Sequence, residues 1–398
     1  MSADPLHYSS LPSDSLSSAG EPKSYYSYYS NHEREDTSIS PLADLLEKRS
    51  VIICAGPGGV GKTTVSAAFA LAAAWLGKRA CVVTIDPAKR LANSLGLSEL
   101  DNTPHQVSGP WPGELWAMML DTKRTFDELV VRYAPSPEQA ESILSNRVYK
   151  NLTDALSGTQ EYMAAEKLYE LHNDDRFDLL VVDTPPTRNA LDFLDAPGRL
   201  TRFLENRIFR ILLMPTKAYL KTLSFATQAL LRTISKVTGG EIVEEAIAFF
   251  QAFEGMEEGF RLRAQHVDQL LNDPKTAFVL VSSPQQEAID EAIYFATKLD
   301  ASRLKPAALI LNRLYPRFGE VASLNGVQLQ GDLKGFKQNL DDMRSIAVME
   351  DNNLSSLLLS LTDVPVVRMY LLSSDVHDLD GLTTIANWML GIDQSQQS

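Results

Sequence analysis

The chain has 398 residues, of which 44% are hydrophobic and 22% are charged, the ordinary balance of a folded globular protein with a large core. Its formal net charge of −14 argues against general nucleic-acid binding and against adhesion to an anionic membrane, since both need a basic surface. No run of about 18 apolar residues predicts a membrane-spanning helix, and the first residues lack a secretory signal, so we expect a cytoplasmic protein.

Residues 1–40 are rich in serine and contain the tyrosine cluster "SYYSYYSN" without any apolar period. This composition predicts a disordered N-terminal tail, because too few apolar side chains are available to form a core. Residues 41–398 are then expected to form the folded domain.

Short β-branched runs alternate with helical patterns from residue 50 onward. The predicted strands are "SVIICAG", "ACVVTID", "FDLLVVDTPP", "TAFVLVSS" and "AALILNRL", with a weaker sixth, "DVPVVRMYLL". Near-continuous apolar runs of this kind are typical of parallel strands covered on both faces. The sequence therefore predicts an α/β fold with a doubly wound, mainly parallel sheet and a ligand site at the carboxyl ends of its strands.

Two long helical stretches, at about 121–175 and 197–272, interrupt this alternation and predict an inserted helical subdomain above the strand ends. Within 197–272, apolar side chains such as Leu220, Leu223 and Leu230 recur at helical spacing and form one face. Two such faces would form a groove for an apolar client helix if they stayed open. The favoured alternative is that they pack on each other as an ordinary core.

"GPGGVGKT", residues 56–63, follows the first strand and opens a helix, and it fits the phosphate-loop pattern GxxxxGK[ST]. Glycines let backbone N–H groups surround phosphate oxygens, a lysine neutralises the β and γ phosphates, and the following hydroxyl can ligate Mg²⁺. The pattern predicts a P-loop NTPase, residues 41–398 being the ATPase domain. The predicted ATP-binding residues of this loop are Gly58, Gly59, Val60, Gly61, Lys62, Thr63 and Thr64.

Two carboxylates end predicted strands, Asp86 in "TIDPAKRL" and Asp183 in "VVDTPPTRNA". Both are therefore expected at the rim where the phosphates would lie. Asp183, together with Thr63, is predicted to hold Mg²⁺, and Asp86 to act on the attacking water. The alternative for each aspartate is a helix N-cap, where this residue type is also favoured.

The motifs "GPGGVGKTT", "TIDPAKRLANSLG", "DTPPTRNALDFLDAP" and "ILNRLYP" resemble, in this order, the bacterial branch of the arsenite-pump and tail-anchored-protein-targeting ATPases. The resemblance implies ATP and Mg²⁺ as cofactors and Lys62 and Asp86 as catalytic residues, with Asp86 polarising the hydrolytic water. It also implies that Asp183 holds the metal through water and that Asn312 and Arg313 contact the adenine. Residues 370–382 resemble the loop that closes over the base.

The resemblance further implies a dimer, either of identical chains or with a paralogous ATPase, and a client or membrane-protein partner. In the family a second lysine of the loop reaches the partner's nucleotide, but this chain has Pro57 there. Proline has no charge, so a substitute such as Lys89, Arg90 or Arg188 is needed for that contact.

Cys54 and Cys81 lie in predicted buried strands, which makes metalloid binding by thiolates improbable. We therefore expect a switch ATPase in which ATP hydrolysis moves the helical subdomain. Two alternatives remain open at this stage: a nucleotide-gated scaffold with little hydrolysis, and a metabolic kinase or ligase that uses the same loop.

Overall fold

The computed structural model describes residues 41–85, 90–147, 149, 159–185, 188–205, 249, 252–316, 332–372, 375–376 and 378–391. The predicted disordered tail, 1–40, lies outside these residues. So do Asp86, Lys89 and the apolar helical face that contains Leu220, Leu223 and Leu230.

The centre of the fold is an eight-stranded sheet with the order β3-β4-β2-β5-β1-β6-β7-β8. Every neighbouring pair is parallel except β3 and β4, which run antiparallel. The strands are β1 Val51–Ala55, β2 Arg79–Thr84, β3 His105–Val107, β4 Glu114–Met119, β5 Leu179–Asp183, β6 Thr276–Ser282, β7 Pro306–Leu314 and β8 Val366–Tyr370. The predicted doubly wound α/β fold is confirmed, and all six predicted strands are present.

Two strands, β3 and β4, were not predicted. β4 has the sequence "ELWAMM", in which Leu115, Ala117 and Met118 are buried, so an apolar signal was present but short. β3 has only three residues, two of them exposed, and its pairing with β4 cannot be read from local composition. These strands extend the sheet beyond β2.

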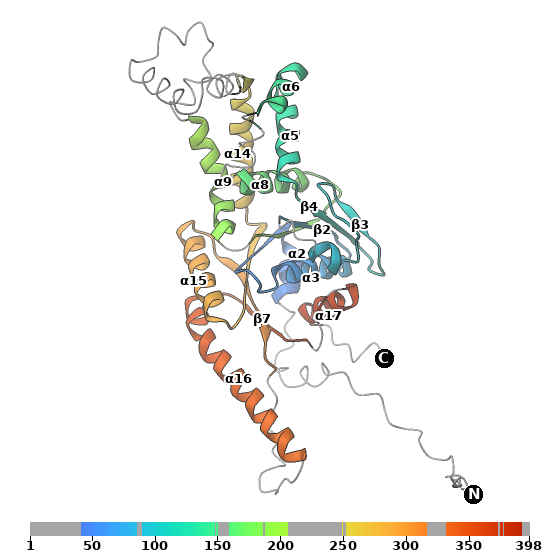
Figure 1. Cartoon of the computed structure of the whole chain (residues 1–398), viewed down its shortest axis with the longest axis vertical. Coiled ribbons are helices and arrows are strands. Elements are labelled where there is room, and N and C mark those ends of the chain that lie inside the picture. Colours follow the sequence, from blue (N-terminus) through green and yellow to red (C-terminus); the bar gives the residue numbers. More distant parts are fainter. Residues whose placement is uncertain are drawn as a thin grey trace, which may run out of the picture. The chain divides into compact units, whose positions relative to one another are not determined.

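Helices cover both faces of the sheet (Figure 1). Their bounds are α2 Pro41–Lys48, α3 Lys62–Trp75, α4 Arg90–Ser94, α5 Thr122–Tyr133, α6 Pro137–Ser145, α8 Thr159–His172, α9 Arg188–Glu205, α14 Glu257–Leu271, α15 Gln286–Ala301, α16 Asp332–Ser360 and α17 Leu379–Met389. Side chains from α2, α3, α4 and α17 form the core on one face. Side chains from α8, α14, α15 and α16 form the core on the other.

The helix that follows the glycine loop, α3, is buried along most of its length. Its sequence "KTTVSAAFALAAAW" is rich in alanine, which has the highest helix propensity and lets a helix approach the sheet closely. Apolar residues occur on all of its sides, as expected of a helix enclosed by a sheet and other helices. α3 contacts β1, β2, β5 and α17, and this packing fixes the direction of its N-terminus.

A third core lies among α5, α6, α9 and the N-terminal parts of α8 and α14. Its centre is formed by five aromatic side chains, each of which contacts two of the others. We call them the aromatic cluster: Phe126, Tyr149, Phe249, Phe253 and Phe260. Ring centroids in these pairs are between 4.9 Å (Phe249–Phe253) and 6.4 Å (Phe126–Phe260) apart. This core is separate from the two cores that cover the sheet.

Candidate nucleotide-binding site

The glycine loop, residues 56–61, connects β1 to α3 as its sequence predicts. Gly58 and Gly59 are exposed at the tip of the loop, whereas Pro57 and Val60 are buried beneath it. Thr64, in the first turn of α3, is half-buried. The loop thus exposes its small residues at the carboxyl end of a central strand, where backbone N–H groups can reach an anion.

Two glycines of this loop are required by close approach of neighbouring chain segments. A Cβ atom on Gly56 would come within 2.0 Å of the carbonyl oxygen of Val281, on β6. A Cβ atom on Gly61 would come within 2.4 Å of Nδ2 of Asn312, and Gly61 has φ of +91°. The second contact joins residues 251 positions apart, so local sequence could not reveal it.

Lys62 is the first residue of α3 and is only 7% exposed. Its Nζ donates a hydrogen bond of 2.7 Å to the carbonyl oxygen of Pro57. A buried ammonium group needs such a partner, because desolvation without one is costly. The charge predicted to neutralise phosphate is therefore held within its own loop, on the carbonyl of the residue that replaces the family's second lysine.

Asp183 ends β5 and is 1% exposed. Its Oδ2 accepts hydrogen bonds from Oγ1 of Thr63, at 2.7 Å, and from Oγ1 of Thr84, at 3.0 Å. The structure thus brings together the two residues predicted to hold Mg²⁺, which are 120 positions apart. A carboxylate beside a hydroxyl is the oxygen donor set that this hard cation prefers, so the residues present fit a magnesium site.

The sequence analysis did not identify Thr84 or Thr184 as part of this site. Thr84 lies opposite Asp183 in the parallel register of β2 and β5, which places its hydroxyl on the carboxylate. Thr184 donates through Oγ1 to the carbonyl oxygen of Cys54, at 2.8 Å, and fastens β5 to β1. A threonine at the end of an apolar strand was the available signal, but its partner depends on strand order.

Asn312, near the end of β7, contacts the phosphate loop directly. Its Nδ2 donates to the carbonyl oxygen of Val60, at 2.8 Å, and its Oδ1 accepts from the backbone N–H of Arg313, at 2.9 Å. Arg313 is exposed and has φ of +62°, a left-handed conformation that is uncommon outside glycine. The predicted adenine residues therefore lie beside the loop, and contact with the base itself stays a prediction.

The remaining predicted residues are only partly described. Asp86 and Lys89 lie outside the described residues, as does the side chain of Arg188, whereas Arg90 begins α4 and is exposed. Within the predicted adenine loop, 370–382, the ring of Tyr370 stacks on Trp388 of α17, with centroids 5.7 Å apart.

Both cysteines are buried, Cys54 in β1 and Cys81 in β2, and β5 lies between these strands. Burial raises the pKa of Cys54 to about 12 and raises that of Cys81 as well. Both groups are therefore held as thiols, which are poor ligands for a soft metalloid.

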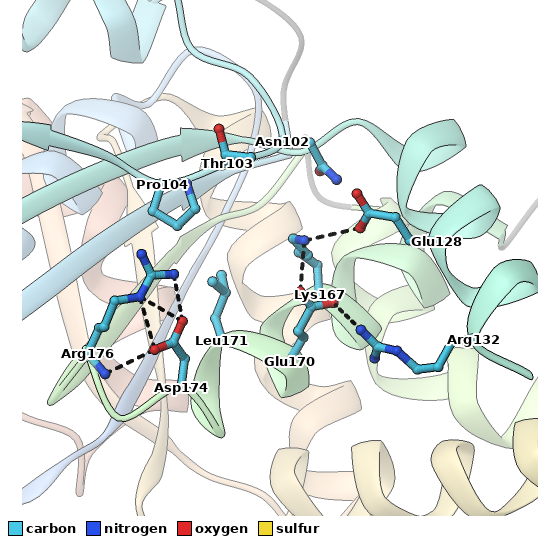
Figure 2. A pocket seen from close by; sticks show the side chains of 10 residues that line it. All are labelled: Asn102, Thr103, Pro104, Glu128, Arg132, Lys167, Glu170, Leu171, Asp174 and Arg176. Atoms are coloured by element: carbon cyan, nitrogen blue, oxygen red, sulfur yellow. Dashed lines mark hydrogen bonds and ion pairs between the residues drawn. The ribbon is translucent and has the colours of Figure 1, made fainter.

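A separate cleft of about 410 Å³ lies among the chain before β3, the helices α5 and α8 and the turn after α8 (Figure 2). It is lined by Asn102, Thr103, Pro104, Glu128, Arg132, Lys167, Glu170, Leu171, Asp174 and Arg176. The buried Nζ of Lys167 lies 3.4 Å from Glu128 of α5 and 3.1 Å from Glu170 of α8. These charges pair with one another, so we interpret them as an ion-pair network that joins the two helices. None of the predicted nucleotide-binding residues lines this cleft.

Most of the chain matches the profile of a known protein family. The profile of the anion-transporting ATPase family matches residues 49–391. The chain is 24% identical to the ATPase GET3 of Malassezia globosa over 89% of this chain and 96% of that protein. It is 28% identical to an uncharacterised protein of Streptomyces coelicolor over 74% of this chain and 68% of that protein. It is 23% identical to the arsenical pump-driving ATPase of Escherichia coli over 85% of this chain and 49% of that protein.

Within the part of the chain that the structure describes, no helix combines the length and the apolar composition needed to cross a bilayer. The family profile covers the phosphate loop, the strand tip at Asp183 and the segment that contains Asn312. This chain is therefore an ATPase that belongs to the anion-transporting ATPase family.

Proposed function

We propose that this chain is a magnesium-dependent switch ATPase, in which ATP binding and hydrolysis at the strand tips move the helices above them. The observation that carries the proposal is the hydrogen bond of 2.7 Å from Oγ1 of Thr63 to Oδ2 of Asp183. Thr63 directly follows the buried Lys62 in the sequence. A lysine, a hydroxyl and a carboxylate gathered at the end of the central strands are the groups that phosphoryl transfer requires.

Each residue has a defined role in this proposal. Lys62 would exchange the Pro57 carbonyl for phosphate oxygens, and the backbone of Gly58, Gly59, Val60 and Gly61 would donate to the same anion. Thr63 and Asp183 would hold Mg²⁺, which supplies positive charge against the phosphates. Asp86 would orient the attacking water, and Asn312 and Arg313 would contact the adenine.

The helices beside the site support its coupling to a larger movement. α9 begins at Arg188, five residues after Asp183, and its Phe193 packs in the sheet-side core while its Ala196 packs in the core of the aromatic cluster. A shift at the strand tip would therefore be passed along α9 to the aromatic cluster. We propose that the helices of 121–175 and 197–272 form the inserted subdomain and that this subdomain binds a client protein.

We also propose that the chain acts as a dimer, with itself or with a paralogous ATPase. Pro57 has no side-chain charge, and its carbonyl accepts the bond from Lys62. An inter-subunit cation would have to come from another residue, and Arg90 is exposed at the start of α4. Because both cysteines are buried thiols, a cargo bound through thiolates is disfavoured.

The proposal can be tested with Lys62→Ala and a matched control, Lys78→Ala, whose lysine lies just after the opposite end of α3. We expect calorimetry to show MgATP binding by the wild-type chain and by Lys78→Ala, and a loss of at least about tenfold in affinity for Lys62→Ala, since a charged hydrogen bond to phosphate is removed. Unchanged affinity in Lys62→Ala would contradict the proposal.

A single-turnover phosphate-release assay separates the ATPase from a scaffold that only binds nucleotide. The wild-type chain should release phosphate, and Asp86→Asn should bind ATP but release phosphate about 10²–10⁴-fold more slowly, the usual contribution of a general base. Equal rates in the two proteins would remove Asp86 from the mechanism. Transfer of the phosphate to a metabolite instead of water would indicate a kinase.

A further inference from the structure

The long helix α16 reaches the nucleotide-binding end of the sheet through one buried carboxylate, that of Glu350. Glu350 is 9% exposed, and its Oε2 accepts a hydrogen bond of 2.8 Å from the backbone N–H of Tyr315. Burial raises the pKa of this carboxyl group, so its position in the middle of a packed helix carries a desolvation cost. Its neighbour Asp351 turns to β8 and pairs with Arg368, at 2.9 Å.

The last residues of β7, 312–314, lie where the register with β8 shifts, beside the phosphate loop, and Tyr315 follows them directly. We call residues 312–315 the β7 end. It includes Arg313 in its left-handed conformation, an arrangement that persists only where the surroundings hold it. At its first residue, Asn312 donates to the carbonyl oxygen of Val60, at 2.8 Å. At its last residue, Tyr315 donates to Glu350. The β7 end is therefore hydrogen-bonded at Asn312 to the phosphate loop and at Tyr315 to α16.

The part of α16 that carries Glu350 is firmly packed. Leu354 and Leu357, one and two turns further along the helix, and Leu361, just after its end, are buried in the core on that face of the sheet. Nδ2 of Asn353 also lies 3.4 Å from the carbonyl oxygen of Pro284, in the connection between β6 and α15. Glu350 is thus held by a packed part of α16, and it restrains the β7 end, where Arg313 has a left-handed conformation.

We propose that Glu350 is a positioning residue for nucleotide binding: it holds the β7 end, residues 312–315, so that Asn312 keeps the phosphate loop in its binding conformation. This inference rests on the proposed function of the loop. The proposed relay consists of two hydrogen bonds, Tyr315 to Glu350 and Asn312 to Val60, on either side of the left-handed Arg313.

The competing explanation is that Glu350 only stabilises the fold by joining α16 to β7. Both explanations predict a lower melting temperature for Glu350→Ala. They differ in what happens to ligand affinity, because a purely structural contact leaves the phosphate loop unchanged in the molecules that remain folded. The matched control is Leu357→Ala, which removes a fully buried side chain two helical turns away that has no part in the relay.

The test measures binding of MgADP and of inorganic tripolyphosphate to the full chain by calorimetry, at a temperature where every variant is folded. Glu350→Ala should weaken both ligands roughly three- to tenfold, the size of one lost hydrogen bond. Glu350→Gln keeps a carbonyl acceptor for Tyr315 and should restore affinity to within about twofold of the wild-type chain. Leu357→Ala should lower the melting temperature at least as much as Glu350→Ala yet leave both affinities unchanged.

A double variant completes the test. If the relay passes through Asn312, then Glu350→Ala should add nothing to the affinity already lost in Asn312→Ala. Additive losses would overturn the relay, and so would weaker MgADP binding with unchanged tripolyphosphate binding. If the wild-type chain bound neither ligand, the proposed function would be wrong and this inference with it. If the wild-type chain bound both and Glu350→Ala matched it, only this inference would be wrong.

Discussion

The strand tips around Asp183 and the aromatic cluster around Phe260 are held together by different interactions. At the tips, short polar side chains are placed by strand register: Cys54 and Thr84 both lie opposite Asp183, and the contacts are hydrogen bonds of 2.7 to 3.0 Å. In the aromatic cluster, large rings from α5, from α14 and from the chain segments around Tyr149, Phe249 and Phe253 pack against one another.

The difference has consequences for what each region tolerates. Sheet register is fixed by many backbone hydrogen bonds, so the tips keep their geometry when one polar group is replaced without a change of shape. Helices joined by side chains can change their relative positions at a smaller cost, which suits a part that moves. α8 links the core of the aromatic cluster to the sheet, since Tyr162 packs in that core while Leu168 packs in the core on one face of the sheet.

The largest effect on stability is expected from Phe260→Ala. Phe260 is 3% exposed and contacts Phe126, Tyr133 and Phe253, so its loss leaves a cavity and should lower the free energy of unfolding by about 3–5 kcal/mol. Urea unfolding measures this, and Tyr294→Ala, which removes a largely exposed ring on α15, is the control with a change within about 0.5 kcal/mol. MgATP should still bind, with a binding free energy changed by no more than about 1–3 kcal/mol, the usual size of coupling between sites, and complete loss of binding by folded Phe260→Ala would break the comparison.

A smaller effect, on activity, is expected from Asp183→Asn. The amide keeps the shape of the carboxylate but not its charge, so magnesium-dependent phosphate release should fall about 10–100-fold, as for other groups that orient a metal. Asp178→Asn is the control, because Asp178 precedes β5 at its other end and pairs with Arg79 on the surface. Equal activity of the two variants would mean that the charge of Asp183 at the strand tip has no role in catalysis.

The smallest effect is expected at Asp101, in the chain that leads into β3. Hydrogen bonds from Thr103 and then His105 lower the pKa of this carboxyl group from 3.8 to about 2. A carboxyl group with a lowered pKa stabilises the folded protein above its unfolded pKa and loses that contribution as pH falls. Asp101→Asn should therefore cost at most about 1 kcal/mol near neutral pH.

The cost of Asp101→Asn should shrink as pH falls from about 4 toward about 2, the interval between the unfolded and folded pKa values. Comparing urea midpoints of the wild-type chain and the variant between pH 6 and pH 3 tests this. A difference that grows on acidification would show that the hydrogen bonds at Asp101 do not favour its charged form.

Much of the fold could be predicted because its signals are local. Continuous apolar runs predicted six strands, and the glycine pattern between a strand and a helix predicted the loop. The bonds of Thr84, Asn312 and Glu350 could not be predicted, because their partners lie 99, 252 and 35 positions away and depend on strand order and helix packing. β3 could not be predicted either, because three residues are too few to show a periodic pattern.

The antiparallel strand β3 also sets a limit on how copies of this chain can join. It forms one edge of the sheet, has three residues and follows Pro104, so it offers very few backbone groups to a strand from another molecule. Its exposed His105 and Gln106 make the edge polar as well. Growth of a continuous sheet between molecules is therefore disfavoured at this edge, which protects the folded protein against aggregation by strand addition.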